Sequence, residues 1–269
     1  MYRTLDTKAI LAQIREVGEI FTAGFRQDRI PQSRQEFMDG LALIEEQSLF
    51  ELRQRIDPVL PDTPWVEDDE FDGLAQTKPA GHREYWLCDT MDGAVQYLQH
   101  IAGWSINLVL IRDGHPFFAA IYDPFQDELF WAIKGQGSFL NNVKLQVSEK
   151  QEAFNMVAVL EYGHQLKTDI SWRPKVEAAF SDLLAKFGVV RNYGPHGLQI
   201  AYLGAGRIDL FLQKDLDTHN WLAGMLVAEE AGAVIRSGNG ADWTWGSEDF
   251  LAGTPNAINL FFTAQNNNP

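Results

Sequence analysis

Two apolar runs, residues 104–111 and 116–122, are separated by a four-residue connection that contains Asp113 and Gly114. An Asp-Gly pair between two β-rich runs is the strongest short-range signal for a hairpin, because its turn needs residues that tolerate positive φ angles. A third β-rich run follows at residues 128–133. The first half of the chain is therefore predicted to contain an antiparallel sheet.

Helical periodicity precedes this sheet. Apolar residues recur every three to four positions in residues 5–25 and 37–56, which is typical of two amphipathic helices. Residues 85–88 begin another strand, which Asp89 is expected to interrupt. Residues 1–150 are thus predicted to form helices packed on an antiparallel sheet.

The second half, residues 151–269, has a different order of predicted elements. Short β-rich runs alternate with helix-like segments, and this alternation indicates a layered α/β subdomain. The expected strands are 154–160, 188–192, 207–213 and 233–236, and the expected helices are 174–187, 197–204, 219–231 and 255–265.

Composition narrows the function classes. Nucleic-acid binding needs a basic surface, and a chain with a formal net charge of −15 does not provide one. Nucleic acid is therefore a poor candidate partner. No apolar run approaches the ~20 residues of a membrane-spanning helix, so no membrane association is predicted. A single cysteine, Cys88, excludes an intramolecular disulfide and fits a cytoplasmic protein.

A pair of carboxylates stands out at the end of the strand that begins at residue 85. Asp89 and Asp92 are three positions apart and lead into Gly93. Such a turn can aim both carboxylates and the carbonyl of Met91 at one hard cation, while the amides of Gly93 and Ala94 face an anion. The alternative is an Asp-rich turn in which Asp89 caps the chain that follows.

Longer motifs resemble a known family. Residues 86–93 are similar to the W-x-x-D-P-[IL]-D-G-T motif of the inositol monophosphatase family, and residues 121–147 resemble its Y-D-P…D-E-L-F segment. Residues 206–209 and 222–232 resemble its closing motifs, in the same order. The resemblance implies a mixed α+β or α/β fold, a five-layer αβαβα sandwich, and magnesium-dependent, lithium-sensitive hydrolysis of a phosphomonoester.

The resemblance also implies a set of site residues. Two or three Mg²⁺ ions are expected, the first held by Glu67, Asp89 and the Met91 carbonyl, and the second by Asp89, Asp92 and Asn220. The register of the acidic run stays open, because any of residues 68–70 could replace Glu67. The catalytic set is Glu67, Asp89 and Asp92. Phosphate and substrate would contact Asp92, Gly93, Ala94, His196, Gln213 and His219.

Several positions depart from the family pattern. Ala94 stands where the family has the threonine that positions the attacking water, and Asn220 replaces an aspartate of the second metal site. Gln213 replaces a glutamate that contacts substrate. These changes predict a weakened second metal site. They leave open a catalytically impaired pseudophosphatase that binds a phosphorylated metabolite or a protein partner.

Nearby residues could compensate for these changes. Asp217 either caps the helix expected at 219–231 or supplies a carboxylate to the site. His196 and His219 are either packing histidines with satisfied nitrogens or donors to a phosphate oxygen. The expected substrate is a small phosphorylated metabolite, with a nucleotide or sugar bisphosphate as an alternative, and the resemblance implies a homodimer.

Overall fold

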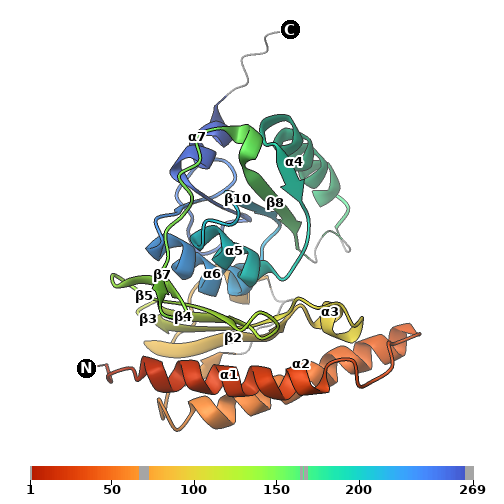
Figure 1. The fold of residues 1–269 in the computed structure, drawn as a ribbon, viewed down its shortest axis with the longest axis vertical. Helices are drawn as coiled ribbons and strands as arrows, with labels where there is room; N and C mark the ends of the chain where they lie inside the picture. The colour runs from red at the N-terminus through yellow and green to blue at the C-terminus, as the bar shows by residue number, and fades with distance from the viewer. Residues whose placement is uncertain (1, 67–72, 164–165, 167–168, 264–269) are drawn as a thin grey trace.

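The computed structural model describes residues 2–66, 73–163, 166 and 169–263, which stack in five layers (Figure 1). Helices α1 and α2 form the first layer, a seven-stranded sheet the second, and helices α5 and α6 the third. A five-stranded sheet and the helices α4 and α7 complete the stack. Three hydrophobic core clusters fill the spaces between these layers. The predicted αβαβα sandwich is confirmed.

The first layer follows from its caps and its apolar stripes. In α1 (Thr7–Gly24) the side chain of Asp6 accepts the N–H of Ala9, and in α2 (Arg34–Ile56) Ser33 accepts the N–H of Glu36. The buried residues recur at helical spacing, which turns one face of each helix to the sheet: Ile10, Ile14, Val17, Gly18 and Phe21 in α1, and Ile44, Ser48, Leu52 and Ile56 in α2.

The first sheet has its strands in sequence order, from β1 to β7. The predicted hairpin is present, and Asp113 (φ 47°) and Gly114 (φ 78°) both take positive φ angles in its turn. Neighbouring strands are antiparallel except β1 and β2, which are parallel. The strands are β1 (Trp65–Val66), β2 (Glu84–Asp92), β3 (Ser105–Arg112), β4 (His115–Asp123), β5 (Glu128–Ile133), β6 (Gly137–Leu140) and β7 (Val143–Lys144).

Strand β2 carries the interruption expected at Asp89. Asp89 does not end the strand, because pairing with β3 resumes at Asp92 after a register shift between these two residues. A shift of this kind bends a strand and redirects its side chains. The irregularity that the sequence suggested at Asp89 is therefore a local distortion within the strand, at the position of the predicted site.

The second sheet is mixed and has the order β11-β12-β10-β8-β9. Strand β12 (Asp249–Gly253) was not predicted. It is a short, almost wholly buried run without polar alternation, which is typical of a strand covered on both faces and gives no periodic signal. The other strands match predicted ones to within three residues at each end: β8 (Val157–Tyr162), β9 (Val189–Arg191), β10 (Leu210–Lys214) and β11 (Val234–Arg236).

The remaining helices cover both faces of the second sheet. Helices α5 and α6 lie between the two sheets, and α4 and α7 lie on the outer face. None of the helices in the described ranges is both long and apolar enough to cross a membrane. The helices are α3 (Ala94–Leu98), α4 (Trp172–Lys186), α5 (His196–Gly204), α6 (Thr218–Glu230) and α7 (Pro255–Phe262), with short 3-10 helices η1 (Ala75–Thr77) and η2 (Ala153–Asn155).

Candidate functional site

The two predicted carboxylates, Asp89 and Asp92, lie at the distorted end of β2. One oxygen of Asp89 accepts the N–H of Met91 at 3.0 Å, so the chain turns back on the Asp89 side chain. The Met91 side chain is buried in the core between the first sheet and α1 and α2. Glu67, predicted beside them, lies outside the described residues, as do its competitors at residues 68–70.

The turn after β2 requires glycine. Gly93 has φ 97°, and a Cβ at this position would lie 3.0 Å from the carbonyl oxygen of Gly103 and 3.1 Å from the Cα of Trp104. Ala94 follows as the first residue of α3 and is buried. The turn is tight, as predicted. Phosphate binding by its amides stays a prediction.

Asp92 joins the two halves of the chain. One of its oxygens, Oδ2, accepts Asn107 Nδ2 at 2.8 Å and the N–H of Gly197 at 2.9 Å, and Oδ1 accepts the N–H of His196 at 3.3 Å. Only 7% of Asp92 is exposed. Its burial raises the pKa of the carboxyl group, although the charge of His196 and the Asn107 hydrogen bond act in the opposite direction.

His196 begins α5 and contacts two further carboxylates. Its Nδ1 lies 3.1 Å from Asp217 Oδ2, and its Nε2 lies 3.6 Å from Glu161 Oε2. Burial by itself lowers the pKa of His196, but the hydrogen bonds to Asp217 and Glu161 outweigh it and raise that pKa well above the ordinary value. Both ring nitrogens thus face carboxylates of the protein, as expected of a histidine with satisfied nitrogens, and donation to a phosphate oxygen stays a prediction.

Asp217 is the N-cap residue of α6, but its side chain accepts no capping hydrogen bond. The capping role is therefore wrong, because the carboxylate is engaged elsewhere. Its Oδ2 accepts Gln213 Nε2 at 2.7 Å, and its Oδ1 accepts Asn220 Nδ2 at 2.8 Å. Burial alone would raise the pKa of Asp217, but the hydrogen bond to His196 and the charge of that ring lower it.

Gln213 and Asn220 face the same carboxylate from two elements. Gln213, in β10, is fully buried, and its Oε1 accepts Trp221 Nε1 at 2.8 Å. Both ends of the Gln213 amide are thus occupied by protein groups. Asn220 Oδ1 is buried and has no hydrogen-bond partner among the described residues. The connected set is called the polar network below: Asp92, Asn107, Glu161, His196, Gln213, Asp217 and Asn220.

His219 lies beside the polar network. Its backbone N–H donates to Gln76 Oε1 at 3.3 Å, and its ring contacts Trp245 edge to face, with ring centroids 6.5 Å apart. A second contact links α2 to β2, where the hydroxyl oxygens of Ser48 and Thr90 lie 2.6 Å apart. His219 of α6 is thus held against η1, and α2 is joined to β2.

Sequence reasoning missed Asn107, Glu161, Gln76 and Ser48. Asn107 in β3 lies directly between Ile106 and Leu108, and Glu161 in β8 directly follows a run of four apolar residues. A buried polar residue in such a run must find a partner, so this interruption was the available signal. Gln76 and Ser48 had no comparable signal, because neither interrupts an apolar strand.

The donor set does not fit the second predicted cation as it stands. Asp92 accepts three N–H groups, Asp217 is bonded at both oxygens, and Asn220 turns its Nδ2 toward Asp217. Within the described ranges, no group of three or more His, Cys, Asp or Glu side chains could hold a metal ion. The first predicted position depends on the undescribed acidic run together with Asp89.

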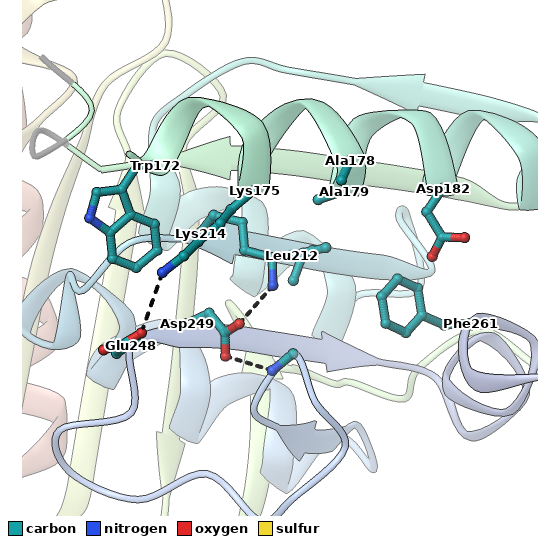
Figure 2. Close-up of a pocket in the computed structure, with 11 residues that line it drawn as sticks. Trp172, Lys175, Ala178, Ala179, Asp182, Leu212, Lys214, Glu248, Asp249 and Phe261 are labelled. Carbon is teal, nitrogen blue, oxygen red and sulfur yellow. Dashed lines mark hydrogen bonds and ion pairs between the residues drawn. The ribbon is translucent and has the colours of Figure 1, made fainter. Parts of the chain in front are cut away.

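A separate pocket of about 540 Å³ opens on the outer face of the second sheet (Figure 2). Lys214 Nζ lies 2.7 Å from Asp249 and Lys175 Nζ lies 3.7 Å from Glu248, so both ammonium groups face carboxylates. Successive residues of a strand point to opposite faces, which places Lys214 and Gln213 on opposite sides of β10. The pocket is therefore distinct from the polar network.

The fold is that of known phosphatase-family structures. The inositol monophosphatase from Anabaena (Nostoc) sp. PCC 7120 superposes with a TM-score of 0.76 at 21% identity, covering 96% of this chain and 94% of that one. The inositol monophosphatase family model matches residues 2–268. This chain belongs to the inositol monophosphatase family.

Several relatives carry the name Nus factor SuhB. The protein from Pasteurella multocida is 24% identical over 91% of this chain and 89% of its own length. The protein from Xylella fastidiosa is 31% identical, over 60% of this chain and 58% of its own length. The shared sequence thus covers less than two thirds of the Xylella protein.

Proposed function

We propose that this protein hydrolyses a small phosphomonoester, slowly and with the help of magnesium. Family membership supports phosphatase chemistry, which is generally magnesium-dependent in this family. The observation that carries the proposal is the contact of Asp92 with the N-terminus of α5. It joins the carboxylate turn of the first half to His196 and Gly197 of the second.

Different residues have different roles in the proposed reaction. Asp89, the Met91 carbonyl and the predicted Glu67 would hold magnesium, which supplies activation of water and offsets phosphate charge. Asp92 is fixed by its N–H donors and orients the turn. The amides of Gly93 and Ala94 bind phosphate oxygens, and the raised pKa of His196 keeps a positive charge near Asp92.

Phosphate release tests this proposal directly. The wild type and Asp89→Asn are compared on inositol monophosphates, nucleotide bisphosphates and sugar bisphosphates at varied magnesium. Slow, magnesium-dependent release that the substitution abolishes is the expected result. Phosphate release that changes neither with the magnesium concentration nor with the Asp89→Asn substitution would contradict the proposal.

A second candidate is a binding protein that retains the family fold. It is favoured by the engagement of Asp92 and Asp217 with N–H donors of the protein itself, which leaves few acceptors for catalytic ions. Relatives named Nus factor also support a role other than catalysis. A rise in Tm with phosphate esters that are never hydrolysed would favour this candidate.

A further inference from the structure

The second cation position has donors where a metal site needs acceptors. Asp92, which the family resemblance makes a ligand of that cation, already accepts hydrogen bonds from Asn107 Nδ2 and from the backbone N–H groups of His196 and Gly197. A side chain at residue 197 would collide with Asn107, so glycine allows this close approach. Two of these three donors, the N–H groups of His196 and Gly197, belong to the backbone and do not depend on a flexible side chain.

Asn220 is turned away from metal binding by its neighbour. The carboxylate of Asp217 can only accept hydrogen bonds, so the amide nitrogen of Asn220 must face it, at 2.8 Å from Oδ1. The reversed amide would place two acceptors against each other. Asn220 is therefore a donor to Asp217, and its oxygen points elsewhere without a partner among the described residues.

Asp217, the nearest carboxylate that could replace the missing aspartate, is also occupied. Gln213 Nε2 donates to its Oδ2 at 2.7 Å, and His196 Nδ1 lies 3.1 Å from the same oxygen. Gln213 is in turn held by Trp221. Both oxygens of Asp217 are thus hydrogen-bonded within a largely buried part of the polar network, and withdrawing them would leave buried donors unpaired.

We infer that hydrogen-bond donors of the chain itself replace the second cation, so that this position binds no divalent metal. Asn107, Gly197 and His196 take the place of the cation at Asp92, and Asn220 does so at Asp217. This inference concerns the proposed function only in the number of metal ions that the site binds. It holds equally for a protein that hydrolyses phosphate esters and for one that only binds them.

Counting bound Mn²⁺ in the absence of substrate tests the inference. Equilibrium dialysis compares the full-length wild type with Asn220→Asp and with the matched control Asn220→Ala. Asn220→Asp sets two carboxylates against each other, so it should take about one additional Mn²⁺ per chain, at least ~10-fold tighter than any such binding in the wild type. Asn220→Ala removes the same amide without adding charge and should bind as many ions as the wild type.

Two results would overturn the inference. A wild type that binds as many Mn²⁺ ions as Asn220→Asp, with affinities within ~3-fold, would show that the position already takes a cation. An Asn220→Ala protein that loses one ion would show that the Asn220 oxygen is a ligand. Phosphate release is measured separately, so failure of the proposed function is recognised independently of these counts.

A wild-type measurement covers the case in which the variants do not fold. The side-chain ¹⁵N resonances of Asn107 and Asn220 are recorded while Mg²⁺ is added. Unchanged shifts of both amides at saturating Mg²⁺ are expected, because their hydrogen bonds to Asp92 and Asp217 stay intact. A large shift of the Asn220 amide would contradict the inference.

Discussion

Asp89 is the carboxylate on which the proposed metal binding depends at the scale of single residues. Asp89→Asn removes its charge but keeps an oxygen that can accept the N–H of Met91. We therefore expect the variant to fold and to lose most of its affinity for Mg²⁺ or Mn²⁺, as measured by calorimetry. Asp62→Asn, at an exposed carboxylate, is the control. Identical isotherms for Asp89→Asn and the wild type would refute the assignment.

Ala94 tests whether catalysis is limited by the missing hydroxyl. Positioning of a reacting group by a side chain typically contributes ~10²–10⁴-fold, so a site without it should be slow. Ala94→Thr combined with Asn220→Asp should raise phosphate release by at least ~10-fold over a low, metal-dependent baseline. Steady-state phosphate assays at several magnesium concentrations provide the comparison.

Two other outcomes of the Ala94 experiment are informative. A wild type that is already fast, and that Ala94→Thr slows, would mean that another group positions the water. If neither protein releases phosphate while both bind phosphate esters, the binding-protein candidate is the better description. Ala94→Ser, which adds a hydroxyl without the methyl group, separates the chemical effect from crowding at this buried position.

Secondary-structure elements were largely predictable from periodicity and turn chemistry. The hairpin of β3 and β4 and the helices α1 and α2 carried strong local signals, and all are present. The interruption of β2 at Asp89 was predicted, but the resumption of pairing at Asp92 and the existence of β12 were not predictable. Each depends on which strand lies beside it, and a sequence pattern shows only how often polar and apolar residues alternate.

Helices α1 and α3 are linked by a tyrosine whose ionisation gives a testable pH dependence. Tyr97 donates its hydroxyl to the carbonyl of Phe21 at 2.9 Å. Burial, with a smaller contribution from the charge of Asp28, raises the pKa of Tyr97 from 10.0 to about 12. The protonated form is therefore favoured in the fold, and its contribution to stability is complete below pH 10 and lost as the pH rises to about 12.

Tyr97→Phe should expose this contribution. At pH 9 we expect the variant to be less stable than the wild type by about 1 kcal/mol, the usual value of one hydrogen bond. The difference in the free energy of unfolding should shrink as the pH rises from 10 toward 12, because Tyr97 then ionises in the unfolded wild type while it stays protonated in the fold. Urea titrations at a series of pH values measure it. A constant difference across that range would argue against the hydrogen bond.

At the scale of the whole molecule, the candidate site was only partly visible in the sequence. The motif around Asp89 and Asp92 was recognisable, and so was the replacement of an aspartate by Asn220. The contact of His196 with Asp217 was not, because it joins α5 to the start of α6 through side chains whose directions depend on the packing of both sheets. Local pattern therefore pointed to candidate ligands but not to their hydrogen-bond partners.

Association of the chain is a prediction that rests on the family resemblance. We expect light scattering at micromolar concentration to give twice the 30.4 kDa mass of the chain. Exposed apolar side chains on the outer helical layer, such as Leu43 and Phe50, supply surface that association could cover. A mass of one chain that persists as concentration rises would contradict the dimer.

The bonds of Asp92 have a consequence for the order in which the protein is made. The backbone groups that hold this carboxylate lie 104 and 105 residues further along the chain. When β2 leaves the ribosome, those groups have not been synthesised, and Asp92 can only be hydrated or held by its neighbour Asn107. During translation the first sheet can therefore form early, whereas the centre of the site is completed only after α5 emerges and docks.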